Sequence, residues 1–277
     1  MPSSYTAADI KALRERTGAG MLDVKKALDE AEGDSSKAME ILRVKGLKGI
    51  TKREGRSASN GLVAAQVDGT TGVLVEVNCE TDFVAKGERF RELAGQVLAA
   101  AVASGATDAQ SLADAQVDGG TTVQALLDEG NATLGEKIEV RRVARLSGAH
   151  VASYLHRTSP DLPPQIGVLL AVDGDDAATA RDVALHIAAM SPNVLAVSDV
   201  PEQTLESERR IAHETAVNEG KPEQALPKIV EGRVKGYLKE NVLLEQAYSK
   251  DNKKTVAQVL SEAGLTATAF ARFRVGS

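Results

Sequence analysis

The stretch Asn78-Cys79-Glu80-Thr81-Asp82-Phe83-Val84-Ala85-Lys86 decides how the middle of this 277-residue sequence is organised. Residues 72–77, just before it, alternate in a way typical of a strand, and residues 90–101, just after it, carry apolar residues at helical spacing. The stretch is therefore a strand-to-helix corner, at which the side-chain oxygen of Thr81 or Asp82 can cap the helix.

Phe83 lies at this corner and is one of only four phenylalanines in the chain. Two interpretations are open from the residues alone. The ring can pack into the core as a hydrophobic staple at the start of the helix, or it can project as an anchor for a partner. Periodicity by itself favours the core staple.

The composition bounds the class of protein. The sequence has a single cysteine, Cys79, no apolar run as long as the roughly eighteen residues of a membrane helix, and no secretory signal at its N-terminus. We therefore expect a cytoplasmic protein. The net charge of −6 argues against general nucleic-acid binding, because phosphate binding needs an excess of Lys and Arg.

Residues 1–45 contain three short apolar-periodic segments and predict a small helical module, because such short helices are stable only when they pack on one another. A basic connector follows, and we assign residues 46–60 to a linker helix, although the run of charge begins at Arg43. Its Lys and Arg residues could contact a nucleic acid or an acidic protein. The lack of interleaved aromatic residues favours a solvated linker.

The rest of the chain contains one pattern twice. Residues 61–147 and 148–277 each predict two strands, intervening helices and a closing strand, and residues 122–146 resemble residues 255–275. We therefore predict an α+β fold with two copies of one unit, each holding a three-stranded antiparallel sheet. An insertion at about residues 201–240 predicts a helical hairpin, which either stabilises itself or forms an arm that meets another subunit or a partner.

The sequence contains no motif for covalent chemistry. It has neither a phosphate-binding glycine-rich loop with the required spacing nor the second histidine of a zinc-protease helix. His150 and His156 share one predicted strand, but without nearby cysteine or carboxylate ligands they do not indicate a metal site. We predict no catalytic residues, no metal, no cofactor and no small-molecule substrate.

Two long segments resemble bacterial elongation factor Ts. They are LRERTGAGMLDVKKAL, residues 13–28, and EVNCETDFVAK, residues 76–86. The resemblance extends over essentially the whole chain and includes Gly135-Glu136, Ser153-Tyr154-Leu155-His156 and Phe270-Ala271-Arg272-Phe273. It is far more specific than a short motif, because both segments are nearly gapless and in the expected order.

That family is the guanine-nucleotide exchange factor of elongation factor Tu, the GTPase that carries aminoacyl-tRNA during translation elongation in protein biosynthesis. The resemblance implies an N-terminal module like a ubiquitin-associated domain, two α+β core subdomains and a coiled-coil hairpin. It implies elongation factor Tu as the partner, with no direct contact to nucleic acid or membrane.

The resemblance also implies which residues bind the partner. They are Met21, Leu22, Thr81, Asp82, Phe83, Val84, Leu134 and His156. Asp82 and Phe83 would enter the GTPase domain near its magnesium and phosphate sites, and His156 would contact another domain. Mg²⁺ is held by oxygen ligands, so displacing those ligands would weaken nucleotide binding without breaking a covalent bond.

One departure from the family concerns the end of the sequence. Many relatives continue past the last strand with an extra helical module, whereas this sequence stops at Val275-Gly276-Ser277, so we expect that contact to be missing or replaced.

The alternative hypothesis is a non-catalytic adaptor that binds a protein through its helical module and hairpin and has no exchange activity.

Overall fold

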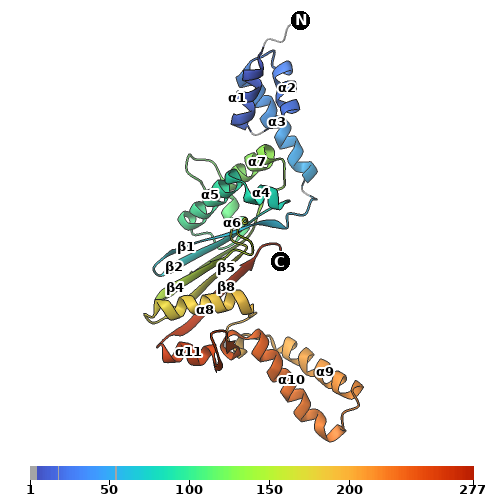
Figure 1. The fold of residues 1–277 in the computed structure, drawn as a ribbon, viewed down its shortest axis with the longest axis vertical. Coiled ribbons are helices and arrows are strands. Elements are labelled where there is room, and N and C mark those ends of the chain that lie inside the picture. Colours follow the sequence, from blue (N-terminus) through green and yellow to red (C-terminus); the bar gives the residue numbers. More distant parts are fainter. Residues whose placement is uncertain (1–4, 18, 54) are drawn as a thin grey trace.

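The computed structural model describes residues 5–17, 19–53 and 55–277, which form an elongated molecule (Figure 1). A group of helices lies at the N-terminal end, two stacked sheets with helices outside them form the middle, and a helical hairpin extends at the far end (Figure 1). The mixed α+β architecture with small antiparallel sheets, predicted from the sequence, is confirmed.

The N-terminal helices are α1 (Ala7–Thr17), α2 (Met21–Glu30) and α3 (Ser35–Arg53). They enclose a small core of their own that includes Leu13, Val24 and Leu28. Helix α3 begins at the cap residue Asp34 and continues without a break into the basic connector. The first part of the connector is therefore a continuation of the third helix, which also packs against α7.

Most side chains of the basic connector, that of Arg43 and those of residues 46–54, lie outside the described residues. Two of its cations can be described. Lys45 forms an ion pair with Glu30, and Arg56 forms one with Glu80 across 3.2 Å. These two cations are thus engaged within the chain.

The first sheet has the strand order β1-β2-β3 and is antiparallel throughout. Its strands are β1 (Asn60–Asp68), β2 (Thr71–Cys79) and β3 (Glu139–Ser147). Between β2 and β3 the chain forms α4 (Asp82–Lys86), α5 (Glu88–Ser104), α6 (Ala109–Ala113) and α7 (Val123–Leu134). The one helix that the sequence predicts after the corner is in fact two helices, because Gly87 adopts an extended backbone (ψ 141°) that ends α4 and begins α5.

The second sheet repeats the first and has the order β4-β5-β8. Its strands are β4 (His150–His156), β5 (Ile166–Asp173) and β8 (Thr266–Arg274), and its helices include α8 (Ala177–Met190) and α11 (Val256–Glu262). The two units also share a helix-capping hydrogen bond at corresponding positions. The hydroxyls of Thr122 and Thr255 each accept an N–H at the start of the helix that precedes the closing strand.

The two sheets pack face to face, with the helices on their outer faces (Figure 1). The layer between the sheets includes Val63, Leu74, Val151 and Leu169. Strand β2 and strand β5 are the middle strands of their sheets and are buried almost along their whole length. The sheet pair forms a rigid platform from which the connections between elements project.

The insertion in the second unit is a helical hairpin, as the sequence predicted. Its helices, α9 (Glu202–Asn218) and α10 (Leu226–Asn241), pack on each other through the buried Ala212 and Ala216, and Arg233 pairs with Glu219 across 2.8 Å. A short turn of helix, η2 (Glu223–Ala225), lies between them, and the flanking segments hold η1 (Val197–Asp199), η3 (Leu243–Glu245), β6 (Ala247–Tyr248) and β7 (Asp251–Thr255). The sequence did not predict the small β6–β7 ribbon.

Candidate partner-binding surface

The strand-to-helix corner forms as the sequence predicted, with Thr81 as the cap. The backbone N–H of Val84 donates to the Thr81 hydroxyl oxygen across 3.3 Å, and Thr81 itself has an extended backbone. Val84 and Ala85 are buried against the first sheet. This leaves the outer side of α4 for Asp82 and Phe83.

Phe83 is exposed, with 83% of its surface accessible to solvent, so the core-staple interpretation favoured by periodicity is wrong. The aromatic residue that fills the core below this corner is Phe90 on α5, which is fully buried. A ring this exposed gains no burial free energy in the free chain, so a partner that covers it would gain that hydrophobic free energy on binding. The exposure of Phe83 is the strongest single indication of a binding site among the described residues.

Asp82 shares the exposed side of α4 with Phe83. Its carboxylate accepts a hydrogen bond from Lys86, with 2.7 Å between the Lys86 Nζ and the Asp82 Oδ2 atoms. The hydrogen bond from Lys86 and its charge hold the pKa of Asp82 below its ordinary value, and the hydrogen bond to Asp82 in turn raises the pKa of Lys86. Asp82 is therefore an anion at neutral pH, and a cationic group or a hydrogen-bond donor on a partner would compete with Lys86 for it.

The corner is held by two glutamates, Glu136 and Glu80, each of which accepts backbone N–H groups of the other's segment. One carboxylate oxygen of Glu136 accepts the N–H groups of Glu80 and Thr81 at 3.1 and 3.0 Å, and the other accepts the Thr81 hydroxyl at 2.6 Å. In return, the Glu80 carboxylate accepts the N–H of Lys137 at 2.7 Å. The residues alone do not indicate this role for Glu136, because Thr81 lies 55 residues away from it in the sequence.

The neighbouring Cys79 is fully buried and has no chemistry to offer a partner. Burial raises the pKa of its thiol to about 12, and the nearby charge of Glu136 adds to this effect. Its sulfur donates to the Thr81 carbonyl oxygen at 3.2 Å. A thiol with so high a pKa is protonated at neutral pH and unreactive as a nucleophile.

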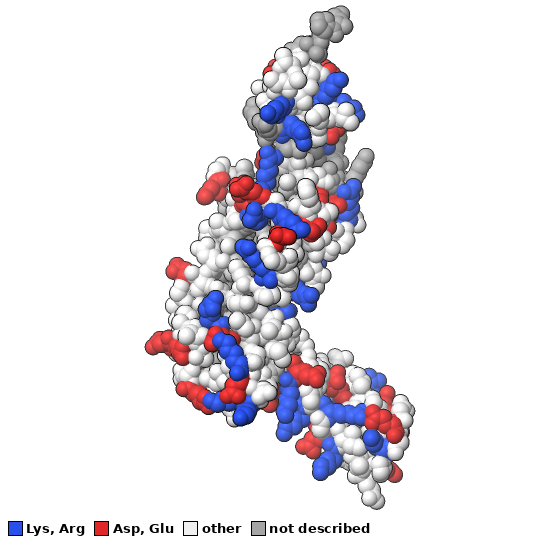
Figure 2. Space-filling model, viewed as in Figure 1, with Lys and Arg blue, Asp and Glu red and all other residues white. Residues whose placement is uncertain are grey.

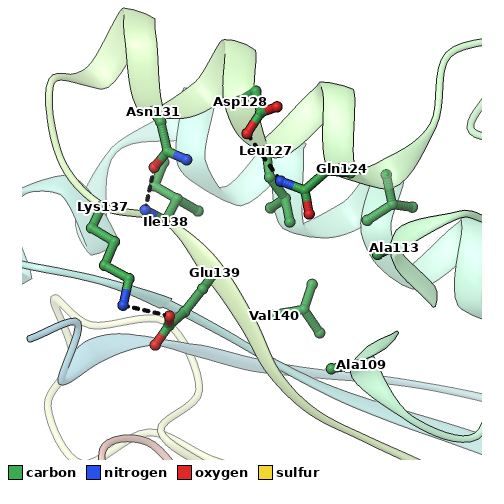
Figure 3. Close-up of a pocket in the computed structure, with 11 residues that line it drawn as sticks. Ala109, Ala113, Gln124, Leu127, Asp128, Asn131, Lys137, Ile138, Glu139 and Val140 are labelled. Atoms are coloured by element: carbon green, nitrogen blue, oxygen red, sulfur yellow. Dashed lines mark hydrogen bonds and ion pairs between the residues drawn. The ribbon is translucent and has the colours of Figure 1, made fainter. Parts of the chain in front are cut away.

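Leu134 ends α7, close to Glu136, and is partly buried against the first core. The turn after it is fixed by Asn131, whose side-chain oxygen accepts the N–H of Ile138, while Lys137 pairs with Glu139 (Figure 3). These groups line a cavity of about 230 Å³ between α6, α7 and β3. Its polar lining groups largely bind one another: Gln124 donates to Asp128, Asn131 accepts the N–H of Ile138, and Lys137 pairs with Glu139.

Met21 and Leu22 open α2 in the N-terminal module and are 60% and 73% exposed. Both are apolar, adjacent and solvent-facing, whereas Val24 and Leu28 of the same helix are buried. These two residues thus form a second small apolar patch, on a different element from Phe83.

His156 is exposed at the end of β4, where the ring of Tyr154 stacks against it at 6.2 Å between centroids. Its two neighbours, Leu155 and Arg157, line a cavity of about 310 Å³ together with Lys86 of α4 and the proline-rich loop. The structure therefore brings the end of β4 and the α4 corner to the rims of one cavity.

Charged side chains of both signs are interspersed on the visible face of the molecule, and no broad field of one sign covers it in the part described (Figure 2). Among the described residues there is no group of His, Cys, Asp and Glu arranged to hold a metal ion. None of the described helices is long and apolar enough to cross a membrane.

Comparison with known proteins fits this geometry. The family model described as Elongation factor TS matches residues 80–277. The chain is 64% identical to elongation factor Ts of Pseudarthrobacter chlorophenolicus over 278 aligned residues, which cover 99% of this chain and 100% of that protein. The corresponding proteins of Kocuria rhizophila and Micrococcus luteus are 64% and 63% identical, again over 99% of this chain and their full length. By full-length similarity and by the match of its core, the chain belongs to the elongation factor Ts family.

Proposed function

We propose that this protein is a guanine-nucleotide exchange factor that binds elongation factor Tu in its GDP form and promotes GDP release during translation elongation. The observation that carries the proposal is the exposed Phe83 beside Asp82 at the tip of a short helix on a rigid platform. The names and full-length similarity of the relatives support the same role.

The proposed mechanism is displacement. Asp82 and Phe83 enter the GTPase near its magnesium and phosphate sites, and Met21, Leu22, Leu134 and His156 supply further contacts. Val84, which the resemblance also implies as a contact, is buried in the free chain and would contribute by supporting the corner from below. Mg²⁺ demands near-ideal octahedral geometry, so a modest displacement of its ligands weakens its hold on the nucleotide.

Exchange of this kind needs no acid, base or metal on this chain, because no covalent bond is made or broken. Thermodynamic linkage also explains how the exchange factor is released from its partner. If this protein weakens GDP binding by a given factor, then bound nucleotide weakens the binding of this protein by the same factor, so the incoming nucleotide releases the exchange factor.

We also propose that the parts of the chain divide this work. Residues 1–45 would form the docking module, 46–60 the linker, 61–147 and 148–277 the two core subdomains, and the hairpin at about 201–240 an accessory arm. The hydrophobic clusters support this division, because the helical module and each sheet with its helices have separate cores.

The test is stopped-flow release of fluorescent GDP from purified elongation factor Tu, with and without this protein. We expect a large acceleration that depends on the concentration of this protein and saturates. Binding seen by gel filtration without any acceleration would contradict the proposal and favour the adaptor, and loss of all binding on deletion of residues 1–50 would then identify its docking module.

A further inference from the structure

We propose that Glu136 is a positioning residue for nucleotide exchange, which sets the direction in which Phe83 projects. This inference rests on the proposed exchange function, because it assigns Glu136 a role only through Phe83. Glu136 is not one of the residues that the family resemblance implied as partner contacts, and it lies on a different segment, between α7 and β3.

Helix α4 is held in place by few contacts of its own. The helix has five residues, from Asp82 to Lys86, and so short a helix is unstable without outside support. Val84 and Ala85 anchor one side of it in the core. These apolar contacts are not directional, so they fix the position of the helix better than they fix its rotation about its start.

Glu136 supplies directional hydrogen bonds at the start of α4. Its carboxylate accepts the N–H groups of Glu80 and Thr81 and the hydroxyl hydrogen of Thr81, all between 2.6 and 3.1 Å. Because the Thr81 hydroxyl donates to Glu136, its lone pairs are left to face the N–H of Val84, which it caps at 3.3 Å. Glu136 thus orients the residue that orients the first turn of α4.

This set of three contacts requires a carboxylate at residue 136. An ionised carboxylate is an acceptor at both oxygens, and it can therefore receive all three donors at once. The isosteric amide of glutamine has one oxygen and one donor group, so at least one of the three contacts is lost. Hydrogen bonds to charged groups are also the stronger ones.

The two segments bind each other in both directions, because Glu80 also accepts a hydrogen bond from the segment that carries Glu136. Glu80 is only 19% exposed in its side chain and receives the N–H of Lys137, while its carbonyl oxygen receives the side-chain amide of Asn60 at 2.8 Å. The segments that carry Phe83 and Leu134 are therefore locked into one surface. A fixed surface pays less entropy on binding than one that must order itself against the partner.

The experiment is a double-mutant cycle in the stopped-flow GDP release assay, using the full chain and elongation factor Tu. The variants are Glu136→Gln, Phe83→Ala and the double substitution. We expect Glu136→Gln to lower the maximal rate of GDP release about tenfold, with a smaller change in the concentration that gives half the maximal rate. In the Phe83→Ala background the same substitution should change the rate less than about twofold, because coupled residues are not additive.

Glu139→Gln is the matched control. Glu139 begins β3 and its side chain pairs with Lys137 across 2.8 Å, whereas the hydrogen bonds found at residues 80–84 do not involve that side chain. It should leave the rate unchanged. Thr81→Val, which removes the hydroxyl from the other side of the contact, should reproduce Glu136→Gln and serves as the test if Glu136→Gln fails to fold.

The outcomes separate this inference from the proposed function. An equal loss in the wild-type and Phe83→Ala backgrounds would show a merely structural role and overturn the inference, and so would an unchanged rate in Glu136→Gln. No acceleration by the wild-type protein would overturn the proposed function, and the inference with it. Faster hydrogen exchange at residues 78–86 in Glu136→Gln, without a matching fall in melting temperature, is the expected signature of a loosened corner.

Discussion

At the scale of single residues, Phe83 and Phe90 lie close together in the sequence but in opposite environments. Phe90 is fully buried under the first sheet, and Phe83 is 83% exposed a few residues earlier. The two are separated by the break at Gly87, which turns α5 away from α4. Sequence periodicity assigned both to the core, because it could not see that break.

We expect Phe83→Ala to lower the rate of GDP release while the protein stays folded. The truncated ring contacts solvent, so its loss should leave the free energy of unfolding within about 0.5 kcal/mol of wild type. If the ring is an interface anchor, binding to elongation factor Tu should weaken by about 2 kcal/mol or more. Stopped-flow release and thermal melting measure the two effects, and a variant with full exchange activity would rule out the wedge.

At the scale of elements, a buried polar network joins the hairpin to the second sheet and its helices. His186 of α8 is fully buried, and its Nδ1 atom accepts the N–H of Ser249 at 3.1 Å. The proton is therefore on Nε2, which donates to the Gln246 side-chain oxygen at 2.9 Å. Gln246 in turn donates to the carbonyl oxygen of Glu240, at the end of α10, across 2.7 Å.

This network makes stability depend on pH. Burial lowers the pKa of His186 below the ordinary value of 6.5, so the unfolded chain binds a proton there before the folded one does. The free energy of unfolding should therefore fall as pH drops below about 6.5, by at most about 1.4 kcal/mol per pH unit, until the pH reaches the folded-state pKa. Above about 6.5 this residue contributes no pH dependence.

The measurement is urea denaturation between pH 5 and pH 8. His186→Gln should be less stable at neutral pH but should lose the part of the acid dependence that His186 causes. His213→Gln, at an exposed histidine of α9, is the matched control and should keep the wild-type profile. Identical pH profiles for wild type and His186→Gln would contradict the assignment.

At the scale of the whole molecule, the close stacking of the two sheets decides the shape of the platform. A Cβ atom at Gly167 of β5 would lie 2.5 Å from Val63 Cγ1 and 2.7 Å from Leu74 Cδ1, both on the first sheet. Glu76 is buried in β2 and accepts both an Arg142 hydrogen bond at 2.7 Å and the N–H of Gly276 at 3.1 Å. Packing and hydrogen bonds thus both tie the two repeats together.

We expect Gly167→Ala to separate the sheets locally and to destabilise the protein by about 1–3 kcal/mol, because overpacking forces side chains and backbone out of place. Gly95→Ala is the matched control, because Gly95 is exposed on α5 with no atom near the position of the added Cβ. It should be neutral or stabilising by about 0.5–1 kcal/mol. Urea denaturation compares the two, and equal stabilities would contradict the packing argument.

Much of the fold followed from local signals in the sequence. Strand alternation, helical spacing and the cap at Thr81 act over a few residues, so they can be recognised without knowing the rest of the chain. The duplication was recognisable because the two copies keep the same order of elements, down to the caps at Thr122 and Thr255. The chain also predicted its hairpin, since two periodic segments joined by a glycine and a proline leave few other arrangements.

The site followed from the sequence only in part. The resemblance implied the stretch around Asp82 and Phe83, but the residues alone left Phe83 between core and surface. Periodicity favoured the core for Phe83 because it could not detect the break at Gly87 that separates α4 from α5. Glu136 could not be assigned to the corner, because the residues that it contacts lie 55 positions or more away in the sequence.

What the sequence determined by itself was therefore the kind and order of the elements, since those depend on neighbours along the chain. Only the tertiary structure decided that Phe83 points to solvent, that Glu136 reaches the corner across 55 residues, and that the two sheets stack closely enough to require Gly167. The physical reason is the same in each case. These features are set by packing and hydrogen bonds between segments far apart in sequence, and no periodicity within one segment records them.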